Sequence, residues 1–514
     1  MTTTAVTSRA PGTRAGHSGF GRLLRAEWVK FRTVRGWVIG MLVALLVTAG
    51  VALLDHSACG GTVVPGGKVI TGVGCAAPAS GPGGVAVTDS FYFVRQPLAG
   101  NGSITVRMTS LTSGQGPAGL QPWSKAGIII TASTRPGSAY AAMMVTAGHG
   151  VRMQYDYTGD IAGPPGTASA ASPRWLRLTR SGGTVTGYQS ADGSRWSVVG
   201  TVRLAGLPAV VQAGMFAASP GSYQSSSQTL GGSSGSGAAT VAAARFDHVS
   251  VTGQRAGGGW AGVAVGGPSP GTGFHRAAGA VTVNGSGDIA PYVAAGGQPG
   301  TSVEQTLTGA VVGLIAVIVV AAMFMTAEYR RGLIRVTFAA SPRRGRVLAA
   351  KAVVIGSVTF LAGLAGSIAA VVAGERLLRS NGNFILPVSA FTEVRAVAGT
   401  AAIVAVAAVL ALALGALLRS SAGAVTAVIA AVVLPYLLAI IVLPAGAADW
   451  LLRLTPAAAF AIQQTTPAYP QVSAPYTPGN GYFPLAPWAG FAVLCGYTAL
   501  AVGLAVVALR RRDA

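Results

Sequence analysis

Residues 307–326 read Leu-Thr-Gly-Ala-Val-Val-Gly-Leu-Ile-Ala-Val-Ile-Val-Val-Ala-Ala-Met-Phe-Met-Thr, a run that contains no charged side chain. A hydrocarbon core of about 30 Å takes roughly 20 helical residues to cross, so this run is long enough to span a bilayer. Further stretches of similar length and character are residues 37–54, 352–373, 396–418, 422–447 and 488–509. We therefore predict a multi-pass α-helical membrane protein with about six transmembrane helices.

The composition of the chain supports a membrane protein over a soluble one. Of its 514 residues only 10% are charged, and the mean hydropathy is +0.54. The formal net charge of +22 could indicate a nucleic-acid partner. However, the basic residues form short clusters beside the apolar runs instead of one stripe, which is typical of membrane proteins and argues against nucleic-acid binding. The expected partner of these clusters is the lipid bilayer.

The distribution of lysine and arginine predicts the orientation of the spans. Basic residues gather before the first span, between the second and third, at Arg419 between the fourth and fifth, and in the tail from Arg510 to Arg512. Because positively charged loops resist translocation, these connections are expected on the cytoplasmic side. The expected layout is a cytoplasmic N-terminus (residues 1–36), a first span (37–54), an extracytoplasmic region (55–306) and five further spans (307–514). The protein would lie in the cell membrane with both termini cytoplasmic.

The extracytoplasmic region has the pattern of an all-β domain. Between residues 85 and 254, β-branched residues alternate with polar ones in short runs, and turn pairs such as Asn101-Gly102 and Asp192-Gly193 separate these runs. Short strands at this spacing favour an antiparallel sandwich. Residues 255–306 are rich in glycine and are expected to form a linker, with strand character only around residues 280–289.

The cysteines leave two readings open. Cys495 lies inside an apolar run and is expected to be a small buried residue. Cys59 and Cys75 flank a Gly-rich segment after the first span, where they either form a disulfide or remain two free thiols. Their spacing does not fit a metal site, and we expect no metal site and no cofactor.

The segment before the first span has the pattern of an interfacial amphipathic helix. Phe20, Leu24 and Phe31 fall near one helical face, with Trp28 within the same segment, and the basic residues lie mostly elsewhere. Such a helix lies in the plane of the membrane surface. A basic anchor ahead of the first span is the alternative.

Three motifs in the membrane part resemble a known family. They are Leu24-Arg25-Ala26-Glu27-Trp28-Val29-Lys30-Phe31, the stretch from Glu328-Tyr329-Arg330-Arg331 to Arg346, and Leu452-Arg453-Leu454-Thr455-Pro456-Ala457. Together they closely resemble ABC transporter permeases of the type-2 exporter class, of the actinobacterial type. The resemblance implies a permease that exports a substrate with energy from a separate ATPase subunit, paired with a second permease subunit as a homo- or heterodimer.

The resemblance also implies a role for the cytoplasmic loop at residues 327–351. In that family the loop docks into a groove on the ATPase, and the residues carried over to this coupling role are Glu328, Tyr329, Arg330, Arg331 and Arg335. The alternative is that the arginines only snorkel at a helix end. No Gly-x-x-x-x-Gly-Lys-Ser/Thr stretch occurs, so the ATPase must be another chain and we expect no catalytic residues here. The spans also carry almost no charge, which argues against a proton or ion relay.

The β domain resembles a laminin-G or concanavalin-like jelly roll. The motifs are Pro122-Trp123-Ser124-Lys125, Pro173-Arg174-Trp175-Leu176 and Arg245-Phe246-Asp247-His248. Such folds often bind glycans, which leaves a glycan ligand open, but the fold alone does not give the function. We expect Trp123, Trp175 and Trp196 to be packing residues, and Asp156 and Asp160 to lie in a solvated loop and not to form a glycosidase pair.

Two alternative functions remain. The chain could be a membrane-anchored receptor or glycan-binding protein whose function lies in the jelly roll. It could also belong to a nontransporting ABC complex that passes ATP-driven motion to the outer domain.

Overall fold

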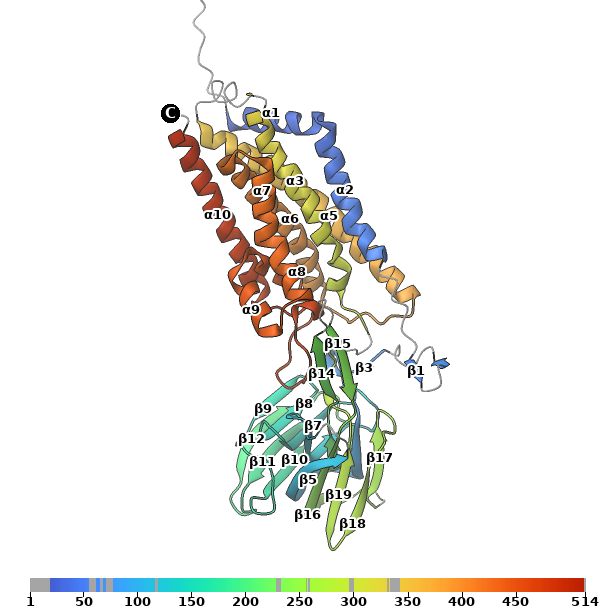
Figure 1. Ribbon diagram of the computed structural model, residues 1–514. Helices are drawn as coiled ribbons and strands as arrows, with labels where there is room; N and C mark the ends of the chain where they lie inside the picture. Colours follow the sequence, from blue (N-terminus) through green and yellow to red (C-terminus); the bar gives the residue numbers. More distant parts are fainter. Residues whose placement is uncertain are drawn as a thin grey trace, which may run out of the picture.

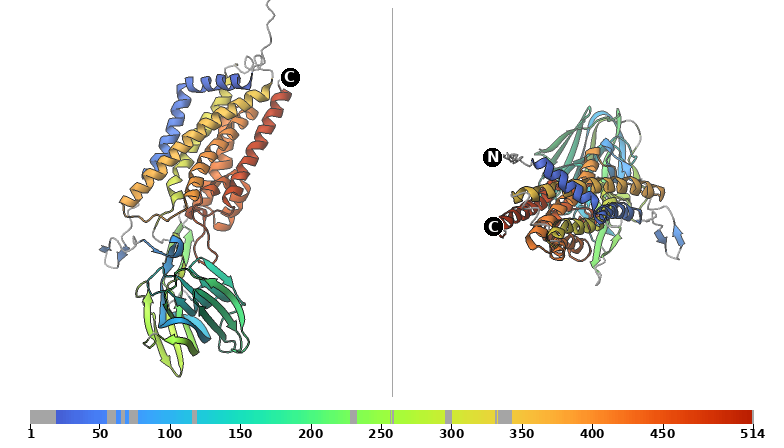
Figure 2. Two further views of the ribbon diagram at one scale, coloured as in Figure 1. Left: turned by 180° about the vertical axis from the view of Figure 1, so that it is seen from behind. Right: turned by 90° about the horizontal axis from the view of Figure 1, so that it is seen from above.

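The structure is a computed structural model. It describes residues 19–54, 62–64, 68–70, 77–115, 119–227, 233–255, 257, 259–294, 300–330, 332 and 343–512. A bundle of helices and a β-sandwich lie end to end, and both side views separate them clearly (Figures 1 and 2). The predicted fold class, a multi-pass helical protein with an inserted β domain, is confirmed.

Six helical segments among the described residues are long and apolar enough to cross a membrane. They are α2 (Arg35–Leu54), η2 with α3 (Val303–Leu307 and Gly309–Arg330), α5 (Arg344–Ser380), α6 (Ala390–Leu418), α7 with η3 and α8 (Ser421–Val428, Ile429–Val433 and Leu434–Ile441) and α10 (Pro487–Arg512). The shorter α1 (Phe20–Thr33), α9 (Ala445–Leu454), η4 (Pro456–Gln463) and η5 (Pro478–Asn480) complete the bundle.

Small residues let neighbouring helices approach closely. A Cβ atom at Gly313 of α3 would lie 2.3 Å from Thr48 Oγ1 of α2, so only glycine allows this approach. Within the fifth span, η3 is a π-helical turn just before Pro435, whose ring nitrogen cannot donate the α-helical hydrogen bond. Beyond this turn, Tyr436 packs on Phe460 of η4 with ring centroids 4.2 Å apart.

Several helices extend beyond the apolar runs that predict them. The third span is expected at residues 352–373, yet α5 begins at Arg344 and ends at Ser380. The added turns of these helices carry Glu304, Glu328 and Lys351, all buried. The expectation that the spans carry almost no buried charge therefore needs correction. An apolar run in the sequence ends at the first charged residue, whereas the helix itself continues through a charged residue that has a partner in the fold.

Alternate connections of the bundle lie at the same end. Helix α1, the C-terminal end of α3, the start of α5, the α6–α7 turn and the C-terminal end of α10 lie at the end far from the β-sandwich (Figure 1). The α6–α7 turn joins the fourth and fifth spans in a tight hairpin. Arg419 adopts a left-handed conformation with φ of 53° and ends α6, and Ser420 caps α7 by accepting a hydrogen bond from the Gly423 amide.

The β-sandwich is built around one long strand. The strands are β1 (Thr62–Val64), β2 (Lys68–Ile70), β3 (Ala79–Ser80), β4 (Ala86–Asp89), β5 (Phe91–Gln115), β6 (Lys125–Thr131), β7 (Tyr140–Thr146), β8 (Val151–Tyr155), β9 (Gly159–Ala162), β10 (Arg174–Ser181), β11 (Thr184–Ser190), β12 (Ser197–Arg203), β13 (Val210–Ala218), β14 (Ser222–Ser227), β15 (Ser233–Ala238), β16 (Val241–Arg255), β17 (Ala261–Val265), β18 (Gly273–Ala277), β19 (Ala280–Gly285) and β20 (Ile289–Pro291). The main sheet runs β12-β11-β10-β5-β13-β6-β7-β8-β9. The first half of β5 pairs with β13 and the second half with β10, so β5 joins the two layers.

The sandwich continues past the boundary expected at residue 254. That position lies within β16, and the expected Gly-rich linker at residues 255–306 contains β17 to β20. β17 pairs with β5, β19 with β16, and β20 with β4. Apolar residues at alternate positions of β19, such as Val281 and Val283, point into the core and explain why this glycine-rich stretch still forms strands.

Candidate functional site

Four charged side chains form a buried cluster at the end of the bundle far from the β-sandwich. Lys351 Nζ of α5 donates to Glu27 Oε2 of α1 at 2.7 Å and to Glu328 Oε1 of α3 at 2.8 Å. Lys30 Nζ of α1 donates to Glu27 Oε1 at 2.7 Å and to Glu328 Oε1 at 2.9 Å. We call Glu27, Lys30, Glu328 and Lys351 the charge cluster. It joins α1 to two spans.

Aromatic rings cover the Lys351 side of the charge cluster. Phe31 of α1 stacks on Trp37 of α2 at 6.1 Å, and Phe324 of α3 meets both rings edge-on at 5.8 and 5.1 Å. The Lys351 ammonium lies 4.5 Å from the Phe324 ring centroid, in range of a cation–π interaction. The side chains of Glu27 and Lys351 are each only 1% exposed, so their attraction is little screened by solvent.

The charges of the cluster balance, with two carboxylates and two ammonium groups. Burial costs each ion its hydration, and only the partner charges offset that cost, so removal of one member leaves another uncompensated. Lys30 is the most exposed member, at 41%. Partial burial lowers the pKa of Lys30, but its hydrogen bonds to Glu27 and Glu328 outweigh this effect and raise the pKa above its usual value.

The residues predicted to couple to an ATPase take different positions. Glu328 lies inside the charge cluster and not on a surface, and the Arg419 guanidinium sits 5.3 Å over the Tyr329 ring. Arg330 ends α3 and is exposed. Arg331 and Arg335 lie outside the described residues. The structure thus buries the acidic member of the predicted coupling segment.

The predicted interfacial helix forms as α1 and lies across the end of the bundle (Figures 1 and 2). Phe31 is buried and Leu24 packs against the bundle core. Phe20, on the same face but in the first turn of the helix, is 41% exposed, and Trp28 is 46% exposed. Helix α1 thus packs on the spans through Leu24 and Phe31, while Phe20 and Trp28 remain largely exposed.

Sequence reasoning identified neither Glu27 nor Lys351 as a site residue. A signal was present, because only 14 residues of the chain are acidic and Glu27 and Glu328 each stand beside an apolar segment. Their common partner Lys351 could not be recognised, since it is far from both in sequence. The predicted pair Cys59 and Cys75 lies outside the described residues, while Cys495 in α10 is a free, half-buried thiol.

A second polar cluster lies at the opposite end of the bundle. Glu304 of η2 is 6% exposed, and within the described ranges no donor lies in good hydrogen-bond geometry to either of its carboxylate oxygens. Arg395 of α6 lies near enough to interact with the Glu304 charge, donates to the Gln464 carbonyl, and leaves its buried Nε unpartnered. Such complementary unpaired groups are usually bridged by ordered water.

The chain at this end also ties the β-sandwich to the bundle. After β20, the Thr301 amide donates to the Phe384 carbonyl at 2.9 Å, and the Leu386 amide donates to the Thr301 carbonyl at 3.0 Å. Gln471, in the loop before α10, donates to the carbonyl of Thr158 in the sandwich at 3.3 Å. The segment just before η2 therefore contacts the α5–α6 connection, and the sandwich itself contacts the loop that leads into α10.

The tryptophans of the sandwich are engaged in packing. Trp123 is buried and stacks on His149 at 3.9 Å, and the Arg177 guanidinium lies 3.9 Å over the Trp196 ring. Trp175 is half-buried beside His248, with ring centroids 5.3 Å apart. These contacts favour packing roles over a free stacking platform for sugars.

The acidic residues of the sandwich are also engaged. Asp160 forms an ion pair with Arg152, and Asp156 accepts a hydrogen bond from the Tyr140 amide at 3.2 Å. Both carboxylates are thus held by neighbouring groups of the sandwich. Within the described ranges, no three His, Cys, Asp or Glu residues form a group that could hold a metal ion.

Comparisons with known proteins identify a family from residues 179–514, which contain part of the sandwich and five of the six spans. A family model described as ABC-2 family transporter protein matches residues 179–514. None of the curated proteins compared matches the chain.

Solved structures give only weak similarity. A functionally unknown protein from Saccharomyces cerevisiae is 15% identical, covering 39% of this chain and 98% of its own, with a TM-score of 0.23. Scytalido-glutamic peptidase, solved with a transition state analog inhibitor, is 8% identical with the same coverage and a TM-score of 0.23. TM-scores this low support no conclusion about activity.

Proposed function

The chain belongs to the ABC-2 transporter family and is a membrane-spanning ABC transporter component, and we propose that it is the permease of an exporter driven by a separate ATPase subunit. The charge cluster carries this proposal. It fastens the interfacial helix α1 to the start of α5 and the end of α3, the two spans whose connection is the expected coupling loop. A force applied by an ATPase to that loop would reach α1, α3 and α5 together.

The proposed orientation puts the charge cluster in the cytoplasmic half and the β-sandwich outside the cell. Basic residues support it, because they concentrate at the charge-cluster end: Arg22, Arg25, Arg343, Arg344, Arg346, Arg419, Arg510 and Arg511. Loops with such an excess remain cytoplasmic. Both termini would then be cytoplasmic, and the protein would lie in the cell membrane.

In this proposal the coupling residues have two roles. Arg330, together with Arg331 and Arg335, would face acidic groups of the ATPase and help to set the docking geometry. Glu328 and Tyr329 would instead position the segment from inside, Glu328 through Lys351 and Tyr329 beneath Arg419. A second permease subunit, identical or related, would complete the complex. A glycan ligand of the β-sandwich remains a proposal that no described contact requires.

The second candidate function is that of a nontransporting ABC complex that moves the outer domain. The continuity of α3 favours this function. Helix α3 has 22 residues and is therefore about 33 Å long. Glu328 stands near one end, and η2 and the strand β20 of the sandwich precede the other. Movement of α3 along its axis at the charge cluster would thus displace the sandwich directly.

Affinity purification of the full chain in mild detergent tests the first proposal. An ATPase subunit should copurify, and the complex should hydrolyse ATP. A chain that repeatedly purifies without any ATPase would instead favour the receptor reading. Deletion of residues 79–291, the sandwich from β3 to β20, separates the two ABC candidates. A transporter should keep its ATPase and measurable substrate flux, whereas a complex that only moves the outer domain should lose its function.

A further inference from the structure

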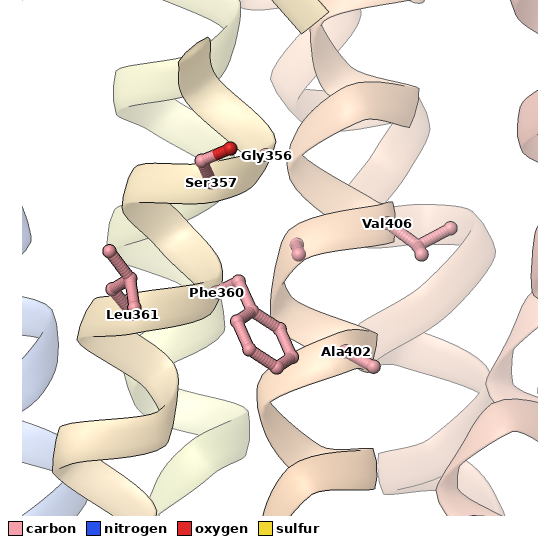
Figure 3. Close-up of a pocket in the computed structure, with 7 residues that line it drawn as sticks. Gly356, Ser357, Phe360, Leu361, Ala402 and Val406 are labelled. Carbon is pink, nitrogen blue, oxygen red and sulfur yellow. The ribbon is translucent and has the colours of Figure 1, made fainter. Parts of the chain in front are cut away.

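Different kinds of contact hold the bundle together and join it to the sandwich. Within the bundle, α5 and α6 face each other with apolar side chains, and Figure 3 shows Phe360 of α5 projecting toward Ala402 of α6. Between the bundle and the sandwich, by contrast, Gln471 supplies two polar contacts. These contacts are hydrogen bonds, which can break and form again while the apolar packing of the spans stays intact.

Gln471 is buried although it belongs to a loop. It is 4% exposed, in the segment between η4 and α10, and its Nε2 donates to the carbonyl oxygens of Tyr157 at 3.4 Å and of Thr158 at 3.3 Å. A side-chain amide is stable at a buried position only when its donor has such partners, so the loop is held against the sandwich here. We call Gln471, Tyr157 and Thr158 the latch.

The loop that carries Gln471 is itself fixed to the bundle. Arg395 of α6 donates to the Gln464 carbonyl at the start of the loop. Near its end, the Phe483 amide donates to Gln464 Oε1 at 3.3 Å, and Pro487 then begins α10. A displacement of α6, or of the end of α10 near the sandwich, would therefore move the loop and with it the latch.

The sandwich side of the latch is a strained turn. Asp156 and Tyr157, between β8 and β9, adopt left-handed conformations with φ of 43° and 65°, although neither is glycine. Two hydrogen bonds hold them there: the Tyr157 hydroxyl donates to Asp89 Oδ2 at 2.6 Å, and Asp156 Oδ1 accepts from the Tyr140 amide at 3.2 Å. Strain of this kind persists only where the surrounding structure fixes it, so the carbonyl groups of the turn keep their direction toward the loop.

The latch is weaker than the other connection between the sandwich and the bundle. Both of its hydrogen bonds are long and join uncharged groups, and a bond of this type shifts an equilibrium by roughly two- to tenfold. The other connection is the chain itself after β20, where Val293 packs with Tyr482 in a buried apolar cluster. The sandwich can therefore leave the loop at the latch while it stays attached after β20.

We propose that the latch gives the sandwich two positions on the membrane part, one docked on the loop before α10 and one undocked, with the chain after β20 as the pivot. In the docked position the sandwich is joined to α6 and α10 as well as to α3. Opening of the latch frees it from α6 and α10, while the chain that leads into α3 still carries it. The latch is separate from the docking of an ATPase, and it applies equally to an exporter and to a complex that only moves the outer domain.

Pulsed electron paramagnetic resonance of the full chain in lipid nanodiscs tests the latch. Nitroxide labels at Ser194→Cys in the sandwich and Ser380→Cys at the end of α5, both exposed positions, report the distance between the two parts after the three native cysteines are replaced by serine. The chain with Gln471 should show mainly one distance. Gln471→Met keeps the length of the side chain but removes the donor. It should lower the ratio of docked to undocked molecules by about threefold or more, which a second, broader distance would report.

Gln189→Met is the matched control, because the Gln189 amide donates within the sandwich, to Ser197 Oγ at 2.7 Å. The control should leave the distances unchanged. Identical distances with Gln471 and with Gln471→Met would overturn the proposal, and so would an equal change in the control. Gln471→Ala removes the same donor and repeats the comparison if Gln471→Met does not fold, as judged by thermal unfolding.

Discussion

Lys351 Nζ and Glu27 Oε2 lie 2.7 Å apart, although 324 residues separate them in the sequence. The contact joins a helix that lies across the bundle to a helix that spans it. Because both side chains are buried, α1 cannot leave the bundle without exposing an uncompensated charge in an apolar site.

Lys351→Met should destabilise the protein by roughly 3–5 kcal/mol, because Glu27 would keep only the half-exposed Lys30 as its partner. Thermal unfolding in detergent measures the effect. Glu27→Gln combined with Lys351→Met should cost less than the sum of the single changes, since the double variant leaves fewer unpaired charges. Arg379→Gln is the control, because Arg379 forms an exposed ion pair with Glu375 that contributes about 0–1 kcal/mol. Additive effects in the cluster would contradict the proposed coupling.

Arg330→Glu should weaken retention of the ATPase several-fold in pull-down experiments, because charge reversal at the docking surface opposes acidic partner groups. Its unfolding temperature should not change, since Arg330 is exposed. Arg376→Glu is the control, because it makes the same charge change at an exposed residue near the opposite end of α5. This variant should retain the ATPase. If both variants behave like the original chain, the coupling surface lies elsewhere.

Asp89 should make the stability of the β-sandwich depend on pH. Burial raises the pKa of Asp89 to about 6, although hydrogen bonds from Tyr157 and the Gly137 amide lower it. A raised pKa means that the folded domain binds the proton more tightly than the unfolded chain does. Stability should therefore be highest below about pH 4 and should fall as the pH rises through about 6, by on the order of 3 kcal/mol.

Asp89→Asn should remove this dependence, because the amide oxygen still accepts hydrogen bonds but carries no charge. Thermal unfolding of the sandwich within the full chain, recorded from pH 4 to pH 7, measures both proteins. A pH profile that is the same for both would show that another group is responsible.

Cys59 and Cys75 should form a disulfide if this region faces an oxidising compartment. Mass spectrometry of non-reduced protein should then detect the linked peptides, and closure of so short a loop would contribute about 3 kcal/mol. Alkylation of both thiols in protein isolated without reductant would contradict the prediction.

The sequence predicts the fold class because the relevant signals are local. Uninterrupted apolar runs give the six spans, and period-two alternation gives strands such as β10 and β11. The ends of the elements are harder to predict. Helix α5 continues through Lys351 because Glu27 and Glu328 neutralise that charge, and both partners belong to other helices.

The charge cluster could be predicted only in part, because its members also belong to different helices. The motifs around Glu27 and Glu328 mark two segments of interest, but nothing in either segment indicates that they meet. Their meeting depends on how α1, α3 and α5 pack, which places Phe31 against Phe324 and thereby creates a dry site. Of the strands after residue 254, the sequence indicates β19, which lies within residues 280–289. The strands β17, β18 and β20 escape prediction because glycine weakens the pattern, while β5, β19 and β4 supply their hydrogen bonds.

The π-helical turn in the fifth span, η3, amounts to a one-residue insertion within an α-helix. Each residue of an α-helix advances about 100° around the axis, so this extra residue sets the direction in which all of α8 faces. Loss of one residue between Ile429 and Val433 would let the helix close regularly and would rotate Tyr436 away from Phe460. An insertion or deletion of one residue at this turn thus changes the direction in which the side chains of α8 point, while the span keeps its apolar composition.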